Sequence, residues 1–205
     1  MIQSILNLLD PLTIIKSVGL LGVVFVIFSE SGLFFGFIFP GDSLLFTAGF
    51  LASQNYLNIY LLVPLCFLAA VFGDNFGYWV GKKLGPKIFT KEDSLFFRRD
   101  YVEKARLFFE KHGNKTIILA RFIPVVRTFA PVLAGVGSMK YVKFVGYNVI
   151  GGFIWAVGMT LGGYFLGELI PNADKYVLWI ILLIITLSIL PVVFNIVKMK
   201  NNFHL

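Results

Sequence analysis

Charged side chains beside proline breaks in apolar stretches are the residues of this sequence most able to do chemistry. Two acids and two arginines share this position: Glu30, Asp42, Arg121 and Arg127. The acids flank Pro40-Gly41, and the arginines flank Pro124. Since a charge near the centre of a membrane helix costs roughly 2.5 to 3.5 kcal/mol on insertion scales, these side chains must pair, hydrate or bind a ligand.

The chemistry of these four side chains favours a site for an anion and a proton. An arginine presents a planar fork that binds phosphate or carboxylate through two hydrogen bonds, and it keeps its charge when it is desolvated. A carboxyl group in an apolar cavity near a guanidinium can be poised to take up and release a proton. We therefore expect Arg121 and Arg127 to bind a phosphate. We expect Glu30 and Asp42 to couple to protons. The alternative is that all these charges form buried salt bridges that only fix the surrounding chain in place.

Asp74 is a fifth ionisable residue within an apolar segment. It precedes Lys82 by eight residues, or about 12 Å of helix, so a supporting role in the site and a structural pairing near the membrane surface fit its position equally well. His112 and His204 are isolated, and the sequence has no nucleophile-base arrangement, phosphate-binding glycine loop or zinc-ligand spacing. We therefore expect no catalytic residue, metal or cofactor, and we do not expect an enzyme.

The composition is that of an integral membrane protein. Of the 205 residues, 58% are hydrophobic and 14% are charged, and the mean hydropathy is +0.83, which lies outside the range of soluble globular domains. Two uncharged stretches, Phe144–Gly167 and Val177–Val197, are long enough to span ~30 Å of hydrocarbon. Cys66 is the only cysteine, so a disulfide framework is excluded. We expect one all-α membrane domain over residues 1–205.

The distribution of positive charge predicts the orientation in the membrane. Ten of the 18 lysines and arginines lie between Lys82 and Lys115. Positive charge gathered in one short segment between membrane helices marks the cytoplasmic side, and its expected neighbours are anionic lipid headgroups, not nucleic acid. The helices expected before this segment are Ile14–Phe28 and Leu57–Gly81. Counting outward from the segment gives about four transmembrane helices, with the N- and C-termini both cytoplasmic.

Two further apolar stretches, residues 29–53 and 116–139, are broken by prolines and are predicted to be re-entrant hairpins. Full crossings there would contradict the orientation, and hairpin backbone is tolerated at membrane depth where protein or a water-filled cavity satisfies it. Each hairpin ends in an Ala-Gly pair and is followed by a helix with Gly-Tyr-x-x-Gly. These pairs are Ala48-Gly49 with Gly77-Tyr78, and Ala134-Gly135 with Gly163-Tyr164. The halves 14–81 and 116–197 are therefore predicted to form an inverted repeat around a midplane site.

The basic segment 82–115 separates the two halves. Apolar residues recur at helical spacing among its lysines and arginines: Phe97, Tyr101, Ala105 and Phe108. This pattern predicts an amphipathic helix over about residues 93–112 that lies on the cytoplasmic membrane surface. A solvated connector with internal pairs such as Arg99 with Glu103 is the alternative.

Several short motifs occur together over about residues 20–195. They are Glu30 with Phe39-Pro40-Gly41-Asp42-Ser43, Gly73-Asp74 with Gly77-Tyr78 and Gly81, Arg121-Phe122-x-Pro124-x-x-Arg127 running to Ala134-Gly135, and Asn148 with Trp155. In these motifs the sequence resembles the DedA family of membrane proteins, also described by the VTT or SNARE-associated domain. The resemblance implies that Glu30 and Asp42 are the family's essential acids and that Arg121 and Arg127 are its essential arginines. Supporting roles are expected for Asp74, Pro40, Gly41, Pro124 and Asn148.

The resemblance also implies a cellular role. It implies residence in the bacterial cytoplasmic membrane and maintenance of the envelope and the proton-motive force. Members of the family are implicated in moving polyprenyl-phosphate carrier lipids, chiefly undecaprenyl phosphate, back across the bilayer. We therefore expect a proton-linked transporter or flippase whose partners are such a lipid, other membrane lipids and protons, and a homo-oligomer stays open. The alternatives are a proton or cation antiporter and a membrane scaffold or chaperone for envelope proteins.

Overall fold

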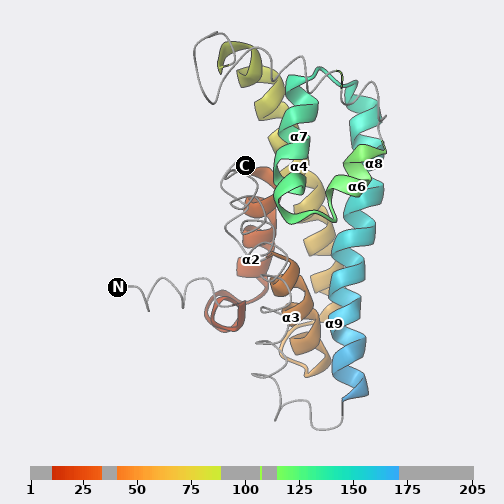
Figure 1. Cartoon of the computed structure of the whole chain (residues 1–205). Coiled ribbons are helices and arrows are strands. Elements are labelled where there is room, and N and C mark those ends of the chain that lie inside the picture. Colours follow the sequence, from red (N-terminus) through yellow and green to blue (C-terminus); the bar gives the residue numbers. More distant parts are fainter. Residues whose placement is uncertain (1–10, 34–40, 89–106, 108–114, 171–205) are drawn as a thin grey trace, which may run out of the picture. The chain divides into compact units, whose positions relative to one another are not determined.

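The computed structural model describes residues 11–33, 41–88, 107 and 115–170, and these residues are mostly helical (Figure 1). The helices are α2 (Pro11–Gly32), α3 (Gly41–Ser53), α4 (Ile59–Ile88), α6 (Thr116–Ala120), α7 (Pro124–Val136), α8 (Tyr141–Gly152), the π-helix η2 (Phe153–Val157) and α9 (Gly158–Leu169). The described part of the chain contains no strand, so the all-α expectation is confirmed there. The predicted span Val177–Val197 and nearly all of the predicted amphipathic segment 93–112 lie outside the described residues.

Within the described residues, two helical stretches are long and apolar enough to cross a membrane. They are Ile59–Leu84, with 26 residues and a mean hydropathy of 1.8, and Tyr141–Leu169, with 29 residues and a mean hydropathy of 1.6. At ~1.5 Å per residue they extend about 39 and 43 Å, which exceeds the ~30 Å of the hydrocarbon layer. The second stretch joins α8, η2 and α9 without interruption. The second stretch contains the expected helix Phe144–Gly167, whereas the first begins two residues after the expected start at Leu57 and ends three residues beyond Gly81.

The helix expected over Ile14–Phe28 is observed as α2, which begins three residues earlier, at Pro11. It continues to Gly32, so Glu30 belongs to its last turn, and it is kinked at Gly19, whose φ is 59° and ψ is −151°. This backbone conformation is one that glycine adopts readily and other residues rarely do. The apolar piece after the kink, Gly19–Gly32, is shorter than a usual membrane span.

The chain breaks near the prolines that the sequence analysis singled out. Residues 121–123 interrupt the helix between α6 and α7, and Pro124 is the first residue of α7, where its missing N–H has no helical partner to lose. Pro131, which was expected to break the second stretch as well, lies inside α7 without ending it. The first stretch contains the end of α2 and all of α3, and residues 34–40 between them are outside the described part. The re-entrant path of both stretches stays a prediction.

Two compact units make up the structure, and each draws on both halves of the sequence. The first unit contains described residues 11–23, 41–62 and 159–170, and the second contains 24–33, 63–88, 107 and 115–158. In the first unit, a Cβ on Gly49 of α3 would collide with the Thr160 carbonyl of α9. In the second unit, a Cβ on Gly135 of α7 would collide with the Tyr78 carbonyl of α4. The Ala-Gly pair of each half therefore packs on the Gly-Tyr-x-x-Gly helix of the other half.

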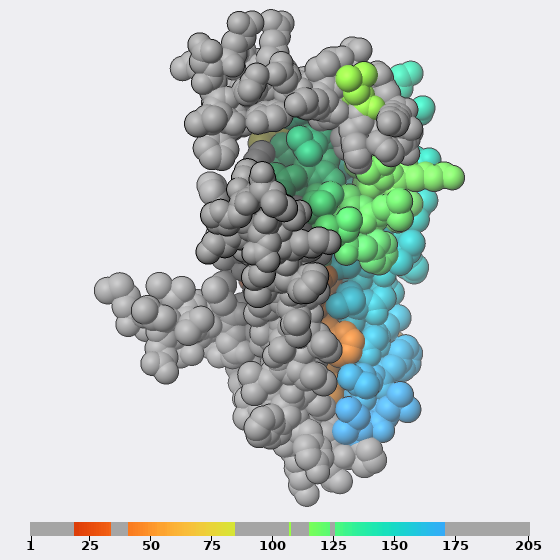
Figure 2. Space-filling model, in the orientation of Figure 1, coloured from red at the N-terminus to blue at the C-terminus, as the bar shows by residue number. Residues whose placement is uncertain are grey.

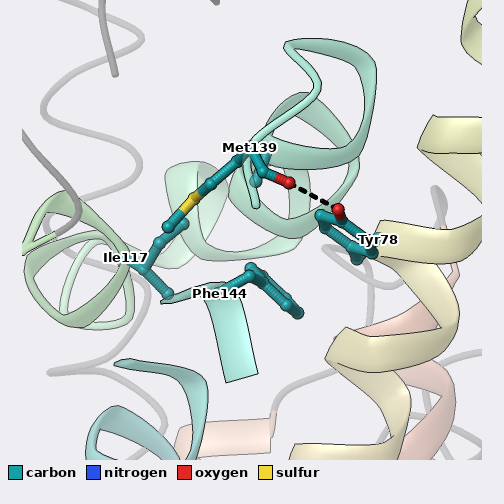
Figure 3. Packing of buried hydrophobic residues seen from close by; sticks show 5 residues of the cluster. Tyr78, Ile117, Met139 and Phe144 are labelled. Atoms are coloured by element: carbon teal, nitrogen blue, oxygen red, sulfur yellow. Dashed lines mark hydrogen bonds between the residues drawn. The ribbon is translucent and has the colours of Figure 1, made fainter. Parts of the chain in front are cut away.

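A small apolar cluster closes one end of the second unit. It contains Tyr78, Ile117, Ala134, Met139 and Phe144. The Tyr78 ring stacks on that of Phe144 with centroids 4.6 Å apart, and its hydroxyl donates a hydrogen bond of 2.6 Å to the Met139 carbonyl (Figure 3). The cluster thus fixes α4 against α8 and the connection after α7. Within this unit α6 also lies along α8, as the light-green and cyan residues in Figure 2 show.

Candidate functional site

An ion pair joins two of the four predicted site residues in the second unit. The Arg127 guanidinium donates through Nη2 to Oε1 of Glu30. Glu30 comes from the last turn of α2, and Arg127 lies in the first turn of α7, which begins at Pro124. The Glu30 side chain is 1% exposed and the Arg127 side chain is 11% exposed. The acid is therefore enclosed, whereas the arginine keeps partial access to its surroundings.

A second buried network holds Arg121 in the break after α6. Its Nη2 donates to Asp74 Oδ2 on α4 and to Asn148 Oδ1 on α8, and Asn148 donates in turn through Nδ2 to the Val71 carbonyl at 3.0 Å. Arg121, Asp74 and Asn148 are all buried. Since charged and amide groups out of water need partners, this network fixes the short α6 segment against two long helices.

Glycines give the Arg121 side chain its place beside α8. A Cβ on Gly151 would lie 2.9 Å from Arg121 Cδ, and one on Gly152 would lie 3.5 Å from Arg121 Cζ. Any larger residue at Gly151 would force the guanidinium to move. The Nε of Arg121 is buried, and within the described part of the chain no hydrogen-bond partner for it is found.

The indole of Trp155 links the two arginines. The ring centroid lies 4.6 Å from Arg127 Cζ and 5.9 Å from Arg121 Cζ, distances at which a cation is attracted to an aromatic face. Trp155 is 4% exposed and sits on the π-helix η2. Such single-turn π segments occur frequently at functional sites, where they re-aim side chains. The two ion pairs therefore belong to one site around one aromatic ring.

The remaining predicted residues lie as follows. Asp42 is in the first turn of α3, and Gly41 is the first residue of that helix; both belong to the first unit. Pro40 is outside the described residues. The Glu30–Arg127 pair joins one of the acids that flank Pro40-Gly41 to one of the arginines that flank Pro124. Arg121 instead pairs with Asp74, which lies within the long helix α4.

Sequence reasoning missed the part that Trp155 plays. The sequence indicates Trp155 only as part of a family pattern, whereas the structure places its ring near both guanidiniums. The signal that could have indicated this is Gly151-Gly152, because adjacent glycines in a membrane helix mark a face that another group approaches closely. The Val71 carbonyl, which orients Asn148, carries no signal in the sequence.

The charges of the site balance. Two acids, Glu30 and Asp74, face two arginines, so the formal charge of the four groups is zero. A phosphate can bind strongly only if an acid is neutralised or displaced, because a further negative charge would otherwise be uncompensated in an apolar setting. Among the residues that the structure describes, no group of three potential metal ligands occurs.

A cavity of about 370 Å³ lies elsewhere, in the first unit. It is formed by the connection between α3 and α4 together with one residue of α9. Its lining residues are Ala52, Asn55, Tyr56, Leu57, Asn58, Ile59, Tyr60 and Tyr164. None of the predicted site residues contributes to it.

Comparison with known proteins places these residues in a wider group. The profile of the VTT domain matches residues 39–165. The chain is similar to Protein DedA of Escherichia coli K12, with 48% identity over 178 residues, covering 86% of this chain and 81% of that protein. It is also similar to an uncharacterized membrane protein of Mycobacterium tuberculosis H37Rv, with 44% identity over 193 residues, covering 90% and 84% of the two chains.

A more distant similarity extends to the inner membrane protein YqjA of Escherichia coli K12. It is 33% identical over 147 residues, which cover 71% of this chain and 67% of YqjA. No solved structure matches the chain.

Proposed function

Because this chain belongs to the VTT-domain family of membrane proteins, which includes DedA, we propose that it is a transporter or flippase of a lipid phosphate. The proposed substrate is a polyprenyl phosphate, with undecaprenyl phosphate as the first candidate, and the proposed role is maintenance of the cell envelope. The proton-motive force drives or gates the movement. The protein is not an enzyme in this proposal, since the site moves a headgroup and a proton and breaks no other bond.

The observation that carries this proposal is the Glu30–Arg127 ion pair. Arg127 is partly accessible, and its present partner is a carboxylate, which a phosphate can replace because both anions fit the guanidinium fork. Protonation of Glu30 removes its negative charge and weakens the Glu30–Arg127 interaction. A phosphate can then take the place of the carboxylate without leaving a buried charge uncompensated.

This exchange gives a physical basis for coupling to protons. With both acids ionised the four charges sum to zero, and one proton on Glu30 gives the site a charge of +1 that complements a phosphate. Loss of the proton restores the Glu30–Arg127 pair and expels the headgroup. Asp42, in the first turn of α3, is the second proposed proton-coupling residue.

Arg121 is proposed to supply positive charge to the headgroup from a fixed position. Its bonds to Asp74 and Asn148 hold it in place, and its cation is near the same Trp155 ring as Arg127. A donor that is already positioned loses little conformational freedom when a ligand arrives. Asp74 and Asn148 are therefore proposed as supporting residues of the phosphate site.

The proposed location is the bacterial inner membrane, with both termini in the cytoplasm. Membrane residence is supported by the two long apolar helices and by relatives named as membrane proteins. The orientation follows from the charge of residues 82–115. A homo-oligomer is compatible with this proposal and is not required by it.

The decisive experiment measures movement of labelled undecaprenyl phosphate across proteoliposome membranes with and without a pH gradient. Wild type, Arg127→Ala and Glu30→Gln are compared, with Val142→Ala at an exposed apolar position as the control. Gradient-stimulated movement in wild type and Val142→Ala, with loss of movement in Arg127→Ala and of the gradient response in Glu30→Gln, supports the proposal. Absence of lipid movement by well-folded wild type contradicts it.

A proton or cation antiporter is the second candidate, and the same ion pair favours it. Protonation alone opens the Glu30–Arg127 pair, so an ion could be exchanged at the acid without any lipid. In that case Arg127 would tune the acid and would not touch substrate. Ion flux in protein-containing vesicles that lack polyprenyl phosphate would select this candidate. If neither lipid nor ion moves, the scaffold alternative is the one left.

A further inference from the structure

Exposed lysines gather at one end of the second unit. None of them belongs to the proposed transport site. They lie at the end of α4, just before α6 and at the start of α8: Lys82, Lys83, Lys115, Lys140 and Lys143. The described segments 75–88, 115–120 and 136–147 contain no aspartate or glutamate. This group of five residues is here called the lysine collar, and within these described segments its charge is of one sign.

Contacts between buried residues next to the lysine collar show that its five lysines lie at the same end of the second unit. Tyr78, one turn before Lys82, hydrogen-bonds to the carbonyl of Met139, which directly precedes Lys140. The Tyr78 ring also lies 5.5 Å from that of Tyr141. Ile117, two residues after Lys115, belongs to the same apolar cluster (Figure 3). Lysines from three chain segments therefore lie around the buried side chain of Tyr78.

Aromatic side chains border the collar on its apolar side. Lys83 Nζ lies 3.7 Å from the Trp79 ring centroid, which is a cation–π contact. Trp79 is 52% exposed and Tyr141 is 51% exposed. Exposed tryptophan and tyrosine beside lysine, at the end of a long apolar helix, are typical of the membrane–water boundary.

We propose that the lysine collar binds the headgroups of anionic phospholipids in the leaflet that this end of the unit contacts. Lysine suits this partner because its ammonium is a compact point charge on a flexible stem, which follows a mobile headgroup. The apolar surface of α4 continues directly into the collar, so a lipid can place its chains on the helix and its phosphate among the lysines. The exposed rings of Trp79 and Tyr141 favour a lipid over an acidic protein partner, because charge complementarity with a protein would not require them.

The strength of the interaction follows from the number of charges. Each lysine near an anionic surface strengthens the attraction of the protein to that surface roughly fivefold. The effect declines with salt, because the screening length falls from about 10 Å at 0.1 M to about 3 Å at 1 M. The inference does not depend on the proposed transport activity, since none of the collar residues belongs to the arginine site.

The test uses the full chain in bilayers with spin-labelled phosphatidylglycerol or phosphatidylcholine, and measures the immobilised fraction of each lipid by electron paramagnetic resonance. Wild type is compared with a variant carrying glutamine at all five collar positions and with a matched variant carrying arginine at the same positions. Size-exclusion profiles and circular dichroism must agree among the three proteins.

We expect wild type and the arginine variant to prefer phosphatidylglycerol several-fold at low salt and less at 1 M salt. We expect the glutamine variant to lose most of this preference. An unchanged preference in the folded glutamine variant would overturn the proposal. So would the absence of any preference in wild type, or capture of a polyglutamate peptide by the collar in place of the lipid preference.

Discussion

Glu30 and Arg127, 97 positions apart in the sequence, form an ion pair that joins the last turn of α2 to the first turn of α7. The pair differs from that of Arg121 with Asp74, in which both side chains are about 5% exposed or less. The Arg127 side chain is 11% exposed. The Arg121–Asp74 pair is therefore the more enclosed of the two, and this difference gives distinct predictions for the two pairs.

The first prediction concerns Glu30→Gln. Glutamine has the shape of the protonated acid and cannot ionise, so the ion pair with Arg127 cannot form at any pH. We expect binding of a lipid phosphate to lose its increase at low pH, whereas wild-type binding increases as the pH falls and Glu30 becomes protonated. Equilibrium binding of labelled undecaprenyl phosphate to the purified protein at several pH values measures this. A Glu30→Gln protein whose binding follows the wild-type pH profile would show that another group takes the proton.

The second prediction concerns the Arg121–Asp74 pair. Asp74→Ala leaves the buried Arg121 guanidinium without its carboxylate, and removal of one partner of a buried pair costs about 3 to 5 kcal/mol. We expect a large fall in the thermal unfolding temperature in detergent. The double variant Asp74→Leu with Arg121→Met removes both charges and should be more stable than Asp74→Ala. Equal stability of Asp74→Ala and wild type would show that the pair carries no structural role.

The third prediction tests the close helix contacts in both units. Gly49→Ala and Gly135→Ala each place a methyl group on the backbone of a neighbouring helix, and overpacking of this kind costs roughly 1 to 3 kcal/mol. Gly146→Ala is the matched control, because a Cβ there meets nothing within 4 Å. It should be neutral or stabilise by up to about 1 kcal/mol through helix propensity. Thermal unfolding of the three variants in one detergent decides between these outcomes.

Much of the helical architecture could be predicted from the sequence, for a physical reason. Long uncharged stretches such as Phe144–Gly167 have few alternatives in a bilayer, where the backbone must satisfy its own hydrogen bonds. Pro124 could be placed at a break because proline cannot donate to the preceding turn. Pro131 shows the limit of this reasoning, since a proline inside a packed helix can be accommodated by its neighbours.

The partners within the site were harder to predict than its members. Arg121 and Asp74 are 47 positions apart, and which acid meets which arginine depends on the rotation and depth of each helix. A hydrophobic pattern does not define these quantities to within one turn. The position of Trp155 depends on the π-helix η2. A π-helical turn changes the direction in which the residues after it point. Composition and periodicity gave no indication of that shift.

The last prediction concerns Trp155 itself. Its ring lies near the cations of Arg127 and Arg121, and a cation–π contact contributes about 0.5 to 2 kcal/mol, depending on desolvation. If the ring holds Arg127 in position while Glu30 is protonated, Trp155→Leu should weaken binding of the lipid phosphate by about 2- to 30-fold. Trp155→Phe should have a smaller effect, because a weaker aromatic face remains.

Trp79→Leu is the control for the Trp155 variants. It removes an aromatic ring that contacts Lys83 and should leave binding of the lipid phosphate unchanged. Titration of labelled undecaprenyl phosphate into each folded variant measures the three affinities. If Trp155→Leu and Trp79→Leu weaken binding equally, the indole acts through general stability and not through the arginines, and the site must be explained by its two ion pairs alone.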